Sequence, residues 1–184
     1  MLSLINNEKT DKNTAHSYIE LYEKLLNNKR YSAKNILEVG VQRGGSIRLW
    51  HDYFENATIY GLDVNLSYDS ILNEPRIKVL LADAYDEKFF KNNFLGKIHF
   101  DMMLDDGPHS LESMIQFIKL YSQVLADNGI LIIEDVQSIG WLDELQKAVP
   151  EHLKQYVETY DLRHIKNRWD DIVFVINKQK LQNN

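Results

Sequence analysis

Short apolar runs alternate with helix-forming segments along most of this sequence. The runs lie at 35–40, 57–63, 76–83, 98–106 and 129–135. The first run ends in glycine, and the other four end in acidic residues. An alternation of strand and helix patterns predicts a mostly parallel sheet that is covered by helices on both faces. We therefore expect an α/β fold, built as a single Rossmann-like domain over residues 1–184.

The N-terminal part of the chain is predicted to be helical. Tyr18, Tyr22 and Leu25 lie on one face at helical spacing and indicate a helix at 14–28, within an N-terminal segment of residues 1–30. If its tyrosines are exposed, this helix would support a homo-oligomer. Ser46 is expected to cap the next helix, which follows the first apolar run.

The C-terminal part continues the alternation. A helix is predicted to begin at Ser110 and to end where Asn128 and Gly129 take the left-handed conformation. Another helix is expected at 141–154. Two strands, at 156–163 and 170–178, then bring the sheet to seven strands, and residues 178–184 form a tail.

Composition excludes several classes of protein. The chain has 27 acidic and 21 basic residues, so it offers no basic surface for nucleic acid. It has no cysteine, which excludes disulfides and thiolate metal sites and is compatible with a reducing compartment. The polar start MLSLINNEKTDKN is not a signal peptide, and no apolar window is long enough to span a membrane. We expect a cytoplasmic protein that acts on small molecules.

Acidic residues gather at the predicted strand ends. In open parallel sheets, ligands bind beyond the carboxyl ends of the strands. The stretch LEVGVQRGGS after the first run supplies Gly40, Gly44 and Gly45, which permit a tight turn close to a ligand. Its GxxxGG spacing is not the dinucleotide fingerprint GxGxxG. Glu38, within the first run, needs a partner if it is buried.

Two of these acids are placed to hold a nucleoside. Asp63 ends the second run, where an acid can accept the hydroxyls of a ribose, although capping a helix is the alternative. Asp83 ends the third run, where an adenine amino group would lie, and surface capping is almost as good an explanation for it.

The stretches DDGPH and IED indicate a divalent cation site. Asp106, Glu134 and Asp135 would converge if the fourth and fifth strands are parallel neighbours, and a cation such as Mg²⁺ would relieve their repulsion. His109 would then stand beside a hydroxyl held by the metal and could take its proton. The alternative is that these acids cap helices and that His109 is an ordinary turn residue.

The stretches TDKNTAHSY, ILEVGVQRGGSIRLW, YGLDVN, LDDGPHS and LIIEDVQ together resemble the class I S-adenosylmethionine-dependent methyltransferases. The resemblance is to the metal-dependent sugar O-methyltransferases of macrolide biosynthesis, of the mycinamicin and tylosin type. It implies that the last two strands form an antiparallel hairpin, that Asp106, Glu134 and Asp135 bind the metal, and that Asp106 and His109 are catalytic, with His109 as the general base.

The resemblance also implies the residues that bind S-adenosylmethionine. Most follow the strands, and the rest belong to an N-terminal segment that lies over the cofactor. The implied residues are Thr10, His16, Tyr22, Glu38, Gly40, Gln42, Gly44, Gly45, Ser46, Asp63, Asp83 and Asp105.

Two departures from the family pattern limit what the resemblance implies. Gln42 replaces the middle glycine of the usual GxGxG turn, so this contact with the cofactor must be modified. The expected N-terminal domain of the macrolide enzymes is not seen in the sequence, which leaves the acceptor open beyond a sugar or sugar-containing small molecule.

Three other functions are considered. A catechol-type O-methyltransferase shares the fold but usually carries a lysine base and a DN pair, and His109 with IED favours the sugar type. An NAD-dependent or nucleotide-sugar oxidoreductase would need GxGxxG and Tyr-x-x-x-Lys motifs, which are not seen. A non-enzymatic domain with a structural ion is the third.

Overall fold

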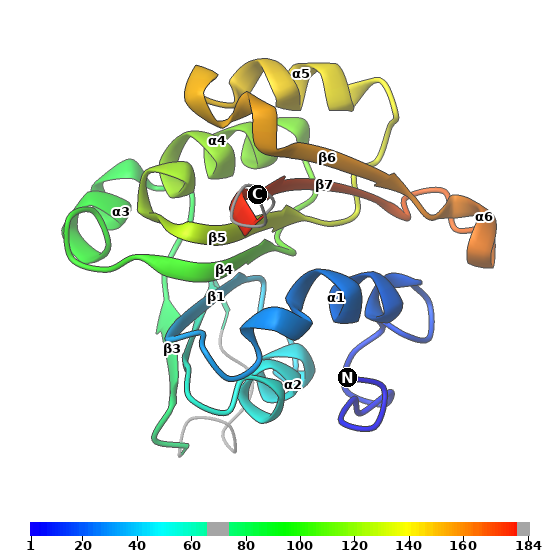
Figure 1. The fold of residues 1–184 in the computed structure, drawn as a ribbon, viewed down its shortest axis with the longest axis horizontal. Helices are drawn as coiled ribbons and strands as arrows, with labels where there is room; N and C mark the ends of the chain where they lie inside the picture. Colours follow the sequence, from blue (N-terminus) through cyan, green and yellow to red (C-terminus); the bar gives the residue numbers. More distant parts are fainter. Residues whose placement is uncertain (66–73, 180–184) are drawn as a thin grey trace.

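A seven-stranded sheet in the order β3-β2-β1-β4-β5-β7-β6 forms the centre of the computed structural model, which describes residues 1–65 and 74–179 (Figure 1). Its apolar strands correspond to the runs found in the sequence, and the predicted fold class is confirmed. The strands are β1 (Asn35–Val39), β2 (Thr58–Asp63), β3 (Ile77–Leu81), β4 (Phe100–Asp105), β5 (Leu125–Ile133), β6 (Val157–Asp161) and β7 (Ile172–Asn177).

The direction of the strands determines which chain segments meet at one edge. β1 pairs in parallel with β2 and β4, β2 with β3, and β4 with β5. β7 pairs antiparallel with both β5 and β6, as the predicted hairpin requires. The carboxyl ends of β1 to β5 therefore lie at the same edge as the amino end of β7. β2 and β3 lie on one side of β1, and β4 and β5 lie on the other. The order of the strands thus reverses at β1, and this edge contains a switch point there.

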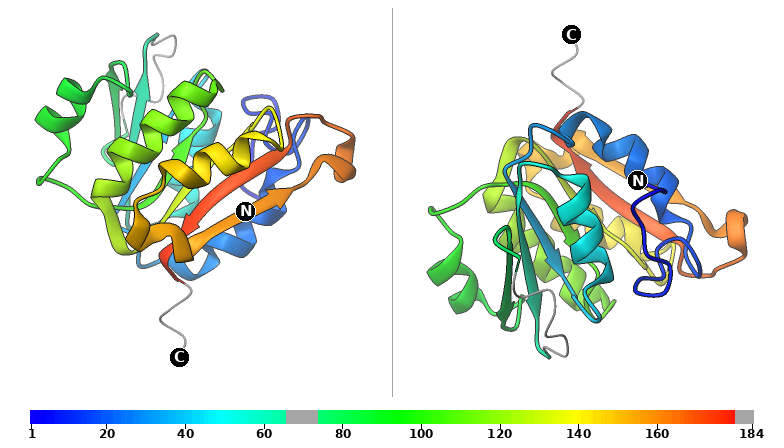
Figure 2. Two further views of the ribbon diagram at one scale, coloured as in Figure 1. Left: turned by 90° about the horizontal axis from the view of Figure 1, so that it is seen from above. Right: turned by 90° about the horizontal axis from the view of Figure 1, so that it is seen from below.

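Helices cover both faces of the sheet, and two views from opposite sides show the two layers (Figure 2). Helices α1 and α2 lie against one face, and α3, α4 and α5 lie against the other (Figure 1). The helices are α1 (Tyr18–Leu26), α2 (Gly45–Tyr53), α3 (Glu87–Asn93), α4 (Leu111–Tyr121), α5 (Trp141–Ala148) and α6 (Arg163–Lys166), and short 3₁₀ helices are η1 (Asn27–Lys29), η2 (Ser122–Val124) and η3 (Glu151–Tyr156).

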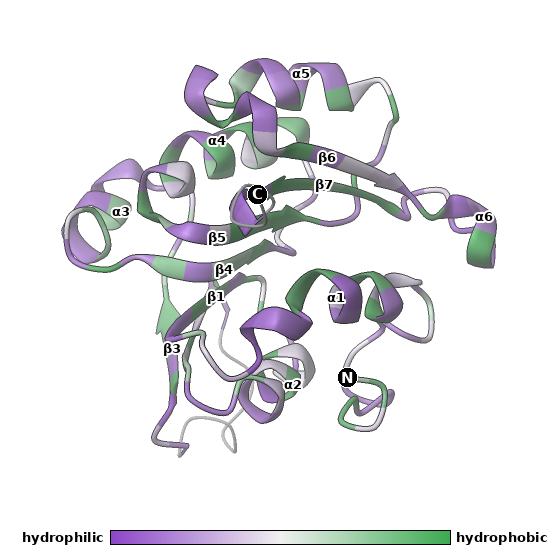
Figure 3. Cartoon of the chain, in the orientation of Figure 1, coloured by the Kyte–Doolittle hydropathy of each residue, from purple (hydrophilic) through white to green (hydrophobic). Residues whose placement is uncertain are grey.

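Each face has its own apolar core. Trp50 and Tyr22, both fully buried, belong to the core under α1 and α2. Phe117 and Tyr121 of α4 stack in the core of the other face, with ring centroids 4.6 Å apart. β7 and the second half of β5 (130–133) are strongly hydrophobic because both of their faces are covered (Figure 3). These two cores hold the strand ends, and hence the acidic residues, in fixed positions.

Several predicted boundaries change. The first helix begins at Tyr18 rather than at residue 14. Ser46 lies inside α2, whose N-cap is Gly44, so Ser46 does not cap this helix. Pro150 interrupts the helix predicted at 141–154, and η3 follows it. Helix α3 was not predicted, and its start is capped by the Asp86 carboxylate.

The predicted end of α4 is wrong. The helix ends at Tyr121, and β5 already begins at Leu125, which pairs with Phe100 of β4. The residues Asn128 and Gly129 therefore lie within a strand and are not among the described residues with positive φ. A register shift between Phe100 and Met102 accommodates the additional residues. The start of this helix is as predicted, because Ser110 and Ser113 form a capping box.

The N-terminal helix does not expose its tyrosines. Tyr18 and Tyr22 are both fully buried, so they offer no surface for a homo-oligomer. The predicted tail lies outside the described residues from position 180 onward. None of the described helices is long and apolar enough to cross a membrane.

Candidate active site

A cavity of about 800 Å³ opens at the carboxyl edge of the sheet. This volume lies in the range of small-molecule and cofactor sites. The N-terminal segment, the turns after β1 to β5 and the loop before β7 all contribute to its walls. The predicted site residues that line it are His16, Gly40, Gln42, Asp63, Asp83, Asp106, His109 and Asp135, and Asp11, Asn65, Tyr85 and Arg168 line it as well.

Gly40 brings the turn after β1 directly against the end of β4. Its φ of 84° lies in the left-handed region, and a Cβ at this position would be 1.9 Å from the carbonyl oxygen of Asp106. The Gly40 N–H donates to the Leu62 carbonyl at 2.9 Å, and the Asp106 N–H donates to the Val39 carbonyl at 2.9 Å. Only glycine permits this approach, which places Asp106 beside the turn.

Asp63 binds the same turn from the end of β2. One carboxylate oxygen accepts the Val41 N–H at 2.8 Å and the Gln42 N–H at 3.0 Å, and the other accepts the Asn65 N–H at 2.9 Å. Burial alone would raise the pKa of Asp63, but these backbone donors lower it below its ordinary value. Asp63 therefore lines the cavity as an anion held by backbone N–H groups.

Left-handed backbone is concentrated around the cavity. Among the described non-glycine residues, positive φ occurs at Gln42 (48°), His109 (54°), Asp135 (55°) and Asn167 (57°). The first three line the cavity. Side chains other than glycine lose energy in this conformation, and such positions tend to cluster at functional sites. The turns after β1, β4 and β5 thus each contribute one strained residue.

Asp106, His109 and Asp135 form a cluster that faces the cavity. Nε2 of His109 lies 3.7 Å from Oδ1 of Asp106 and 3.6 Å from Oδ2 of Asp135. One donor atom from each residue lies within 4.8 Å of the other two. The distances to the histidine are longer than hydrogen bonds, so its ring faces both carboxylates without being bonded to them. This group has the spacing and the hard oxygen donors that suit a divalent cation.

Lys12 and Glu134 lie on the buried side of this cluster. The Lys12 ammonium, 1% exposed, donates to Oδ2 of Asp106 at 2.6 Å and also to Glu134, and it lies 3.8 Å from Glu38. Tyr22 donates its hydroxyl to the second oxygen of Glu134. Burial lowers the pKa of Lys12, but the three carboxylates outweigh it and hold the pKa well above its usual value. Lys12 is therefore a buried cation.

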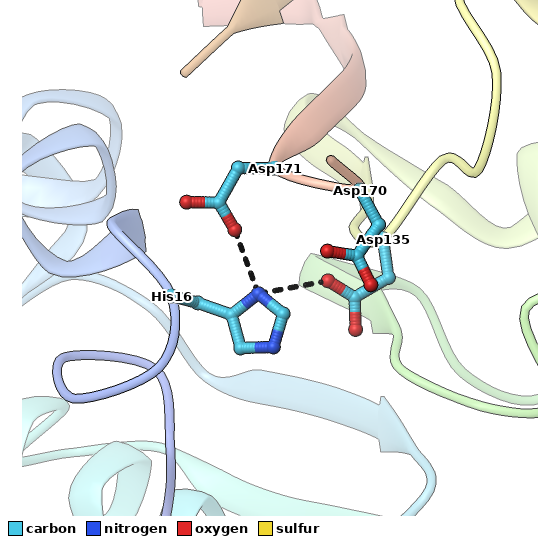
Figure 4. A group of neighbouring side chains, drawn as sticks. All are labelled: His16, Asp135, Asp170 and Asp171. Carbon is cyan, nitrogen blue, oxygen red and sulfur yellow. Dashed lines mark hydrogen bonds and ion pairs between the residues drawn. The ribbon is translucent and has the colours of Figure 1, made fainter. Parts of the chain in front are cut away.

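His16 connects the N-terminal segment to the loop before β7 (Figure 4). Its Nδ1 lies 2.7 Å from Asp171 and 3.2 Å from Asp135. Asp171 also accepts the Ser17 N–H at 3.1 Å, and Tyr18 donates its hydroxyl to Asp135. These bonds fix the ring of His16 at the cavity and orient Asp135.

Other predicted cofactor residues are set back from the cavity. Glu38 is fully buried and accepts the Ser46 hydroxyl at 2.8 Å. Gly45 lies beneath the N-terminal segment, where its Cβ would be 2.3 Å from the Lys9 carbonyl oxygen. Asp105 accepts the Tyr85 hydroxyl at 2.5 Å, and burial raises its pKa to about 7. Thr10, Tyr22 and Gly44 do not line the cavity either, and neither does the predicted metal ligand Glu134.

Two residues that the sequence did not indicate bind predicted site residues: Lys12 binds Asp106 and Glu134, and Asp171 binds His16. Lys12 lies in the quoted motif TDKNTAHSY, but a polar stretch gives no periodic signal that a side chain is buried. Asp171 precedes an antiparallel strand, so the rule that ligands bind beyond the carboxyl ends of parallel strands does not point to it. The adjacent acids in NRWDD were the available signal for it.

Several relatives of this chain are named as O-methyltransferases. No protein-family model matches the chain. It is 29% identical over 141 residues to 8-demethyl-8-alpha-L-rhamnosyl tetracenomycin-C 2'-O-methyltransferase of Streptomyces olivaceus, a match that covers 72% of this chain and 36% of that protein. It is 29% identical over 134 residues to mycinamicin VI 2''-O-methyltransferase of Micromonospora griseorubida, covering 68% and 33%. The chain thus spans about a third of the length of these relatives.

Solved structures agree with the fold. The MycE methyltransferase from the mycinamycin biosynthetic pathway, in complex with Mg and SAH, superposes with a TM-score of 0.71 at 21% identity, over 92% of this chain and 52% of that one. A caffeoyl-CoA O-methyltransferase structure from Staphylococcus aureus, itself described as putative, gives 0.56 at 17% identity, over 86% and 81%. The chain has the class I methyltransferase fold, and its predicted resemblance to the macrolide sugar O-methyltransferases is confirmed.

Proposed function

We propose that this protein is an S-adenosylmethionine-dependent O-methyltransferase that acts on a hydroxyl of a sugar or sugar-containing small molecule, with a divalent cation such as Mg²⁺. The observation that carries the proposal is the meeting of Asp106, Asp135 and His109 in a cavity that Asp63 also lines. The sugar O-methyltransferases among the relatives support the acceptor class.

The cavity has features that suit an adenosyl cofactor. Asp63, the predicted ribose acceptor, lines the cavity beside the glycine turn, where backbone N–H groups hold its carboxylate. Asp83 lines the cavity at the end of the next strand, where the adenine is expected. The turn itself offers backbone at close range, because Gly40 and Gln42 both line the cavity.

The acidic cluster suits a hard cation. Asp106, Glu134 and Asp135 are the proposed ligands, and carboxylates are the donors that Mg²⁺ prefers. Asp106 and Asp135 already face the same space. Glu134 is bonded to Lys12 and Tyr22 and does not line the cavity, so it would reach a cation there only after a local rearrangement. The bound cation would lower the pKa of an acceptor hydroxyl.

The chemistry then needs a base beside the acceptor. S-adenosylmethionine supplies an electrophilic methyl group on a sulfonium, and transfer leaves S-adenosylhomocysteine. His109 is partly exposed to the cavity, and its Nε2 is within 3.7 Å of both Asp106 and Asp135, so it would accept the hydroxyl proton at that nitrogen.

The test separates binding from turnover. We expect His109→Ala to bind S-adenosylmethionine and Mg²⁺ within about threefold of wild type and to lose methyl transfer by 10²-fold or more. Calorimetry measures the binding, and mass spectrometry of sugar-bearing acceptors measures the transfer. His152→Ala, at an exposed position far along the chain, is the matched control. Turnover close to wild type in His109→Ala would exclude His109 as the base, and absence of S-adenosylmethionine binding to wild type would exclude the proposed function.

A further inference from the structure

The Lys12 ammonium lies among the carboxylates of the acidic cluster. It is bonded to Asp106 and Glu134, two of the three acids that we propose as metal ligands. It is also 3.8 Å from the fully buried Glu38. A buried carboxylate without a counter-charge is strongly destabilising, so the Lys12 ammonium stabilises these acids in their charged form.

Lys12 comes from the N-terminal segment rather than from the sheet. The backbone of Lys9 packs directly against Gly45, and the His16 ring is bonded to Asp171. Lys166 donates to the His16 carbonyl at 2.6 Å and so attaches the segment to α6. The position of the Lys12 ammonium thus depends on how residues 9–16 lie over the site.

Asp106 has two different neighbours on its two oxygens. Oδ2 accepts from Lys12 at 2.6 Å, and Oδ1 points toward His109 at 3.7 Å. Glu134 likewise uses one oxygen for Lys12 and the other for Tyr22. The same carboxylates therefore serve the ammonium in this arrangement and are the proposed donors to a divalent cation.

We propose that Lys12 is the resident counter-ion of the acidic cluster and competes with a divalent cation for Asp106 and Glu134. The inference rests on the proposed function, because it requires these acids to be metal ligands. Lys12 acts as a positioning residue: it keeps the cluster folded before a cation arrives, and its positive charge weakens cation binding. Cation binding is then coupled to the release of residues 9–16 from the site.

The test compares Lys12→Met with wild type and with Lys9→Met, which changes an exposed lysine of the same segment. We expect Lys12→Met to bind Mg²⁺ about tenfold tighter or more, because a positive charge next to the site is removed. Without Mg²⁺ its thermal midpoint should fall, and saturating Mg²⁺ should raise that midpoint more than in wild type. Lys9→Met should match wild type in all three measurements.

Hydrogen exchange of the wild-type protein gives a measurement that does not depend on the variant folding. Amides of residues 9–16 should exchange faster when Mg²⁺ is added, because Lys12 leaves its partners. Slower exchange there, or Mg²⁺ affinity of Lys12→Met equal to or below that of wild type, would overturn the inference. S-adenosylmethionine binding by wild type is measured in parallel, since its absence refutes the proposed function whatever the result for Lys12.

Discussion

Replacing Gly40 by alanine should damage the site through the backbone rather than through lost side-chain contacts. Gly40 has a φ of 84°, and the new Cβ would lie 1.9 Å from the carbonyl oxygen of Asp106 and 2.7 Å from its carbonyl carbon. Both neighbours are main-chain atoms at the end of a central strand, so no side-chain rotation can relieve the overlap. Either the turn or the end of β4 must move.

The cost can be estimated from two contributions. Left-handed φ costs alanine about 1 kcal/mol relative to glycine. Moving β4 away by about 1 Å would weaken the bonds from Gly40 N–H to Leu62 and from Asp106 N–H to Val39, at about 1 kcal/mol each. Allowing for residual strain, we expect Gly40→Ala to lower the free energy of unfolding by about 3–5 kcal/mol.

Gly96 provides the control. It has a similar φ of 70°, but a Cβ there would have no atom within 4 Å. Gly96→Ala should therefore show the conformational cost alone, about 1 kcal/mol. Urea unfolding followed by circular dichroism measures both variants. If Gly40→Ala loses no more stability than Gly96→Ala, the close approach of the turn to Asp106 is not the constraint described here.

Three further predictions concern the same edge of the sheet. Burial raises the pKa of Glu38 from 4.5 to about 7, so the folded state holds a proton that the unfolded state releases, and this group should lower wild-type stability by up to about 3 kcal/mol as pH rises from 4.5 to 7. The raised pKa of Asp105 adds a decrease of its own, so Glu38→Gln should show a smaller decrease than wild type in urea titrations at several pH values, and an unchanged slope would contradict the assignment. Asp63→Asn should weaken S-adenosylmethionine binding at least about tenfold in calorimetry and reduce stability by about 1–3 kcal/mol, because the turn loses an anionic acceptor, whereas wild-type affinity would remove Asp63 from the ribose site. Gly45→Ala should speed hydrogen exchange around Lys9, because the new Cβ would lie 2.3 Å from its carbonyl oxygen, and unchanged exchange would mean that the segment does not depend on this contact.

The strand ends were the most predictable part of the site. The period of apolar runs determines where strands occur, and the parallel arrangement brings their carboxyl ends to one edge. Asp63, Asp83, Asp106, His109 and Asp135 all line the cavity for this reason. Their metal-binding and catalytic roles stay predictions, because placement alone does not establish chemistry.

The inner side of the cluster was not predictable by the same reasoning. Lys12 reaches Glu134 across 122 positions of sequence, and only tertiary packing brings the two together. Glu38 was expected to hold the cofactor, but the N-terminal segment and Ser46 cover it. The predicted end of α4 was wrong because Asn128 and Gly129 are typical of a helix end. In the structure both residues lie within β5, which pairs with β4 at Leu125 and again from Ile130 onward. Local patterns were overridden there by the sheet.

The insertion of β7 between β5 and β6 has a consequence for how such a site can diversify. Because β7 runs against its neighbour β5, the connection from β6 to β7 emerges at the cavity mouth and carries Arg168 to the wall, while Asp171 anchors it to His16. Lengthening or shortening this connection leaves every parallel pairing untouched. Under the proposed function, changes in this connection would alter the contacts with the acceptor while the turns after β1 to β3, where the methyl donor is expected, stay the same.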